Sequence, residues 1–201
     1  MTRSRASGFT LIEILAVMAI LILLISLATP MITSAQEKSR VVACTSNVRN
    51  IAVAMKSYVD LRKDGKWPKE SSGIKFLLVL YKAKEIEGHN AKVFLCPGTQ
   101  DENHGGKDYD DWDNIDPNSI SYAGRDSINH PIQVNDLVKM AIVSDDNQNR
   151  ANHKHQTIVG YADGHTQAFD IDDFLGQIGE LKYIPVGPES PEEDLKVLSA
   201  E

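Results

Sequence analysis

The stretch that decides the fold is Gly8–Glu13, Gly-Phe-Thr-Leu-Ile-Glu, together with the apolar run that continues it to Thr29. From Phe9 to Thr29 the run is about 21 residues long, so as a helix it would span roughly 31 Å, which matches the hydrocarbon core of a bilayer. Its only charged residue is Glu13. The sequence therefore predicts a membrane helix over residues 9–29, preceded by a leader peptide over residues 1–8.

A secretory signal peptide and a plain membrane anchor are the two ordinary explanations of such a run. The run is longer than the apolar part of a usual signal peptide, and Ala28-Thr29-Pro30 is a poor cleavage site. Both explanations also leave Glu13 unexplained, because a carboxylate inside a membrane is costly and requires a partner. The position of Glu13 therefore indicates a helix that meets another polar group within the membrane.

Residues 8–17 resemble the N-terminal motif of type IV prepilins, a family that includes the pseudopilins of type II secretion. Gly8, Phe9 and Glu13 stand in the register of that family, with Thr-Leu-Ile between the last two. The resemblance implies that a membrane-embedded prepilin peptidase cuts after Gly8 and methylates the new N-terminus at Phe9. It also implies that Glu13 pairs with the terminal amine of a neighbouring subunit in a fibre.

The same resemblance implies a structural subunit of a type IV pilus or a type II secretion pseudopilus, and it does not separate these two. The partners would be the prepilin peptidase, like or related pilin subunits and the inner-membrane assembly machinery. Arg3 and Arg5, in a leader without acidic residues, predict a cytoplasmic N-terminus and an exported domain. With the resemblance, this implies a single-pass protein of the bacterial inner membrane whose domain lies in the periplasm. After assembly the subunit would belong to a periplasmic or cell-surface fibre.

The acidic charge of the chain limits its partners further. The formal net charge is −7, and it falls to about −9 once the leader with its two arginines is removed. Such a charge argues against a nucleic-acid-binding protein.

Residues 30–184 are predicted to form one pilin-like soluble domain. Its helix continues over residues 30–61, because apolar residues from Val41 to Val59 recur at three- to four-residue steps. Apolar segments that read as strands follow at residues 119–123, 140–144, 157–162 and 165–170. The predicted fold class is therefore α+β, with a long N-terminal helix packed on a small antiparallel β-sheet.

Two C-terminal features complete the domain, and a tail follows it. Asp163-Gly164 separates the last two strand candidates and predicts a β-hairpin with a two-residue turn, in which both central residues have positive φ. Residues 171–184 predict a short helix or extension. Residues 185–201 are rich in Pro, Glu and Ser, which predicts a disordered tail.

Cys44 and Cys96 are the only cysteines of the chain. In an exported domain they are candidates for a disulfide, which would close a loop of about 53 residues and contribute roughly 4 kcal/mol in the chain-entropy model. Two separate buried thiols are the alternative, and a metal pair is disfavoured because no further cysteine completes a thiolate site. Residues 44–52 and 94–97 resemble a pilin-like group with an early cysteine and a later Cys-Pro, which favours the disulfide.

His153, nine residues and then Asp163-Gly164 resemble the H-X9-DG motif of prepilin-type processing-associated proteins. Together with His155 and His165, these residues also suggest a zinc site or acid–base chemistry. Asp163 is explained by the turn, however, and we find no nucleophile context or phosphate loop, so we expect no enzyme. A membrane-anchored metal-binding or hydrolytic exported domain is the alternative function.

A structural explanation of His153 is a hydrogen bond across the hairpin that fixes its register, with Asp145 and Asp146 in the same polar cluster.

The acidic stretch 98–118 is a candidate calcium site, because calcium prefers several oxygen ligands. Its candidate ligands are Asp108, Asp110, Asp111 and Asp113. The spacing does not fit an EF-hand, but type II major pseudopilins have a calcium site in a comparable loop. A solvated acidic surface loop is the alternative.

Overall fold

The structure is a computed structural model that describes residues 9–69, 71–146, 152–179 and 182–200. The leader, including the predicted cleavage position Gly8, lies outside the described residues. The chain divides into two compact units, one up to Lys38 and one from Ser39 onward. We describe each unit by itself.

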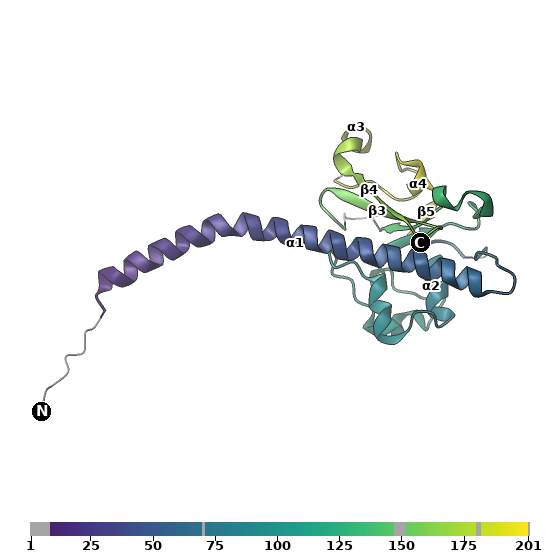
Figure 1. The fold of residues 1–201 in the computed structure, drawn as a ribbon, viewed down its shortest axis with the longest axis horizontal. Coiled ribbons are helices and arrows are strands. Elements are labelled where there is room, and N and C mark those ends of the chain that lie inside the picture. The colour runs from purple at the N-terminus through teal and green to yellow at the C-terminus, as the bar shows by residue number, and fades with distance from the viewer. Residues whose placement is uncertain (1–8, 70, 147–151, 180–181, 201) are drawn as a thin grey trace, which may run out of the picture. The chain divides into compact units, whose positions relative to one another are not determined.

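The helix α1 extends over Leu11–Leu61 and passes from the first unit into the second (Figure 1). Pro30 lies inside this helix without ending it. In the first unit no residue of the helix is buried, whereas in the second unit one face is. The buried residues of this face are Cys44, Val48, Ile51, Ala52, Met55 and Val59. The long helix with an amphipathic second half, predicted from the spacing of apolar residues, is confirmed.

The second unit contains a five-stranded antiparallel sheet with the order β4-β3-β2-β1-β5. Its strands are β1 (Tyr122–Arg125), β2 (Ala141–Asp145), β3 (Gln156–Tyr161), β4 (Thr166–Asp170) and β5 (Leu198–Ser199). This sheet confirms the α+β class. The first strand is displaced from the predicted segment 119–123, because residues 117–119 form the short 3-10 helix η3 instead.

Helices α1 and α2 (Gly73–Lys82) cover one face of the sheet, and the C-terminal segments cover the other. Tyr122, Ile142 and Ile158 belong to the core with the two helices, whereas their neighbours Ala123, Ala141 and Val159 belong to the second core. This alternation follows from the two-residue period of a strand. The remaining elements are η1 (Gly88–Phe94), η2 (His104–Tyr109), η4 (Val134–Lys139), η5 (Ile171–Phe174), α3 (Leu175–Ile178) and α4 (Glu193–Lys196).

The predicted β-hairpin is present, but its turn differs from the prediction. The strands β3 and β4 pair in register up to Gly160 and Thr166. Of the two turn residues only Gly164 has a positive φ, of 95°, since Asp163 is not among the described non-glycine residues with positive φ. The amide of Gly164 donates to the carbonyl of Tyr161, and the amide of Tyr161 donates to the carbonyl of His165. The loop is therefore one residue longer than a two-residue turn and ends in a glycine bulge.

The prediction of a disordered tail over residues 185–201 is wrong for its described part. This segment contains α4 and β5, and β5 pairs with β1 at the edge of the sheet. Leu195 and Leu198 are buried in the second core. The average composition of the segment is polar, but these leucines bury enough apolar surface to hold it on the sheet.

We expect Leu195→Ala to destabilise the domain by about 2–4 kcal/mol, because Leu195 has no exposed surface and its truncation leaves a cavity. Thermal unfolding of the full chain in mild detergent, followed by circular dichroism, measures the change. Leu175→Ala is the matched control, since Leu175 is 53% exposed, and it should cost less than about 0.5 kcal/mol. Equal melting temperatures for the two variants would contradict the docked tail.

Candidate functional site

The first candidate site is the N-terminal half of α1, whose apolar side chains have no cover within the described chain. Phe9, Leu11 and Ile12 are 84%, 77% and 74% exposed, and the apolar residues that follow to Ile32 are at least 46% exposed where they are large. Of the helices in the described residues, α1 is the one that is long and apolar enough to cross a membrane. Such a surface suits either lipid or the apolar helices of other subunits.

Glu13 and Thr10 form a reciprocal cap at the start of this helix. The backbone amide and the hydroxyl of Thr10 each donate to Oε2 of Glu13 at 2.8 Å. The amide of Glu13 in turn lies 3.4 Å from the hydroxyl oxygen of Thr10. This arrangement is a capping box, in which two residues satisfy each other's free helix-end amides. The carboxylate therefore has a local partner within its own chain, in addition to any partner in a neighbouring subunit.

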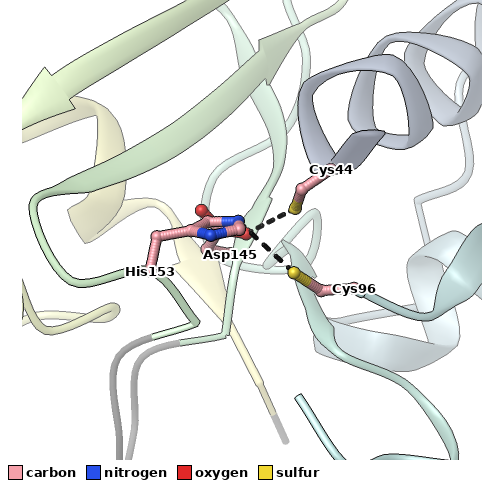
Figure 2. Close-up of side chains that lie close together, drawn as sticks. All are labelled: Cys44, Cys96, Asp145 and His153. Atoms are coloured by element: carbon pink, nitrogen blue, oxygen red, sulfur yellow. Dashed lines mark hydrogen bonds between the residues drawn. The ribbon is translucent and has the colours of Figure 1, made fainter. Parts of the chain in front are cut away.

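The second candidate site is a buried cluster of Cys44, Cys96, Asp145 and His153 (Figure 2). Cys44 lies on α1, Cys96 follows η1, Asp145 ends β2, and His153 precedes β3. Each side chain is at most 2% exposed. One ligand atom of each residue lies within 4.8 Å of the ligand atoms of the other three. The structure thus joins the two predicted disulfide residues with the predicted motif histidine.

Hydrogen bonds fix the orientation of these four side chains. The Cys44 thiol donates to Oδ1 of Asp145 at 3.1 Å, and Nε2 of His153 lies 3.3 Å from Sγ of Cys96. The other carboxylate oxygen of Asp145 accepts from the amide of Ile158 at 2.8 Å. The carboxylate is therefore held with one oxygen on the sheet and the other facing the sulfurs.

The electrostatics of the cluster separate its two thiols. Burial raises the pKa of Cys44 well above its usual value. The neighbouring Cys44 thiol and His153 together lower the pKa of Cys96 to about 6, against the opposing effect of burial. Burial also raises the pKa of Asp145. Cys96 is therefore the sulfur that loses its proton first.

The histidines of the predicted cluster do not lie together in the structure. His153 lies among the cysteines, whereas His165 stacks on Tyr161 with 4.2 Å between ring centroids and bonds to Asp163 beside it. His155 is exposed. Within the described residues, the one group of metal-ligand side chains that converges is the cysteine cluster, so a zinc site made of His153, His155, Asp163 and His165 is not formed. His153 points to Cys96 rather than across the hairpin, and Asp145 joins it as predicted.

The four candidate calcium ligands do not converge in the described structure. Asp108 pairs with His104, and Asp110 accepts a hydrogen bond from Tyr81. Asp111 accepts hydrogen bonds from the amide of Asp113 and from Asn114. Calcium binding would therefore require this loop to rearrange.

Both cysteines are free thiols in the structure, and the disulfide between them stays a prediction. Three residues around the cluster were not singled out from the sequence: Gly98 and Tyr122, which contact the sulfurs, and Asn152, whose side-chain amide donates to Asp145. The amide of Gly98 donates to Sγ of Cys96, and the Tyr122 hydroxyl lies 3.2 Å from Sγ of Cys44. The proximity of Gly98 to Cys96 and of Asn152 to His153 in the chain was the only available signal.

Comparison with known proteins identifies the N-terminal site. Residues 3–29 match the family model of the prokaryotic N-terminal methylation motif, which is the prepilin-type cleavage and methylation signal. No curated protein and no solved structure matches the chain. The chain therefore carries a prepilin-type signal within residues 3–29.

Proposed function

We propose that this chain is a structural subunit of a type IV pilus or of a type II secretion pseudopilus. One observation carries the proposal: the segment that matches the methylation motif is the same segment whose apolar side chains lack cover. A subunit that assembles through its first helix needs both features. The signal directs processing, and the exposed apolar side chains of the helix pack on other subunits.

In this proposal a prepilin peptidase cuts after Gly8 and methylates Phe9. The subunit first crosses the inner membrane once, with its N-terminus in the cytoplasm and its domain in the periplasm. It then joins like or related subunits through the inner-membrane assembly machinery. The domain has a structural rather than an enzymatic role, and the H-X9-DG resemblance of His153, Asp163 and Gly164 agrees with a processing-associated prepilin.

The intact mass of the protein purified from its native membranes tests the processing step. We expect a chain that starts at Phe9 and carries one methyl group. The Gly8→Glu variant should remain at full length, because it lacks the glycine after which the peptidase cuts. Phe9→Leu is the control: it changes the residue after the cut but keeps an apolar side chain, so cleavage should persist. A wild-type chain that still contains its leader would overturn the proposal.

A further inference from the structure

The buried cluster has a composition that assembly through the first helix does not require. It brings two thiols, a carboxyl group and an imidazole together from four separate parts of the domain, each at most 2% exposed. Burying groups that ionise is costly unless a charge of opposite sign or a complete hydrogen-bond network compensates them. A divalent cation bound by all four groups would provide that compensation.

The distances within the cluster are close to those of a metal site. A tetrahedral zinc ion with bonds of about 2.0–2.3 Å holds its ligand atoms about 3.3–3.8 Å apart. The Cys44 sulfur lies 3.1 Å from Oδ1 of Asp145, and the Cys96 sulfur lies 3.3 Å from Nε2 of His153. Small outward movements of the side chains would admit the ion.

We propose that Cys44, Cys96, Asp145 and His153 bind one zinc ion as a closed structural site. The two sulfurs favour zinc over calcium or magnesium, which prefer oxygen ligands. Four protein ligands in a buried position leave no open coordination position for a substrate, as is typical of structural zinc. On binding, zinc replaces the protons of the ligands, and these protons pass to solvent.

Neighbouring groups support this site in the way that outer hydrogen bonds support metal ligands. The amide of Gly98 donates to Sγ of Cys96 at 3.3 Å, and the amide of Ile158 donates to Oδ2 of Asp145. A Cβ atom on Gly98 would lie 2.3 Å from the carbonyl oxygen of Asn152 and 3.3 Å from Cε1 of His153. Glycine at position 98 thus lets the cysteine loop approach the histidine segment.

A disulfide between Cys44 and Cys96 is the competing chemistry, and it excludes the zinc site because it consumes both thiolates. Its formation removes two hydrogens and requires an oxidant. It would use the two sulfurs only, and it would not account for the convergence of the buried Asp145 and His153 on the same point. The geometry therefore favours the metal, and the experiment must detect either result.

The test begins with the full chain, purified in detergent without a metal-affinity tag. We expect about one zinc per chain by plasma mass spectrometry, and an intact mass that keeps both thiol hydrogens after denaturation without reductant. After removal of zinc, cobalt should produce the visible bands of a tetrahedral site and the ultraviolet thiolate-to-cobalt bands. This readout needs no variant, so it holds even if the ligand variants fold poorly.

His153→Gln and His165→Gln form the matched pair, because one histidine lies in the cluster and the other stacks on Tyr161 outside it. We expect the first to weaken zinc binding more than about 100-fold and the second to leave it unchanged. A zinc-free protein that is two hydrogens lighter, or a protein without cobalt bands, would overturn the proposal. Equal loss of zinc in both variants would also overturn it.

Discussion

Glu13→Gln is expected to give a normally cleaved protein that is largely lost from the fibre fraction. Glutamine has almost the same size and retains an oxygen that accepts from Thr10, so the cap at the helix start can persist. It removes the negative charge that would compensate the ammonium group of a neighbouring subunit. Breaking a buried ion pair costs about 3–5 kcal/mol, so the fibre fraction, measured by immunoblot after shearing and centrifugation, should fall more than tenfold.

Thr10→Val is the control that separates the two roles of Glu13. Valine removes the hydroxyl that donates to Oε2 of Glu13 but leaves the charge in place. The loss of a helix cap costs about 1 kcal/mol, so most fibres should remain. If Thr10→Val abolished fibres as completely as Glu13→Gln, the capping box alone would explain Glu13, and the pairing between subunits would be wrong.

Gly124→Ala is expected to destabilise the domain strongly although it adds only one carbon atom. A Cβ atom on Gly124 would lie 2.1 Å from the carbonyl oxygen of Gly73 and 2.9 Å from Cγ of Leu77. The first atom belongs to the backbone at the start of α2, so the helix would have to move away from β1. Such overpacking costs about 1–3 kcal/mol or more, which thermal unfolding of the full chain in detergent measures.

Gly176→Ala provides the matched control for this change. A Cβ atom on Gly176 meets nothing within 4 Å, and the residue lies within the short helix α3. Alanine is favoured over glycine in a helix by about 0.5–1 kcal/mol, so this variant should be as stable as the wild type or slightly more stable. A melting temperature of Gly124→Ala equal to that of Gly176→Ala would contradict the close packing of α2 on the sheet.

The features that depend on local spacing could be predicted from the sequence. The periodicity from Val41 to Val59 indicated the buried face of α1, where the buried apolar residues are Val48, Ile51, Ala52, Met55 and Val59, together with Cys44. The alternation around Asp163-Gly164 indicated β3 and β4. The apolar run and Glu13 indicated the N-terminal site, which the family model confirms as a methylation motif.

The buried cluster could not be assembled from local spacing. Cys44 and Asp145 are 101 positions apart, and Cys96 and His153 are 57 apart. Their convergence depends on how α1 packs on the sheet and on which way β2 runs, and neither follows from residue types alone. The two cysteines alone lack a third thiolate ligand, and of the histidines near the hairpin only His153 reaches the sulfurs, whereas His165 stacks on Tyr161.

The order of the tail does not follow from its composition. Residues 185–201 are polar on average, and the average conceals the two leucines that dock the segment, Leu195 and Leu198. Their burial depends on an apolar surface formed by Ala123, Val159 and Tyr161 on the far face of the sheet. Composition describes a segment alone, whereas order depends also on the surface that it meets.

The position of β5 determines when the sheet can be completed. Strands β1 to β4 come from residues 122–170, but the edge of β1 is paired by residues 198–199. A ribosome that has completed β1 at residue 125 must continue to residue 198 before that edge can be paired, so β1 has an unpaired edge throughout that interval. Until residues 198–199 reach the sheet, the unpaired edge of β1 is open to pairing with the wrong strand.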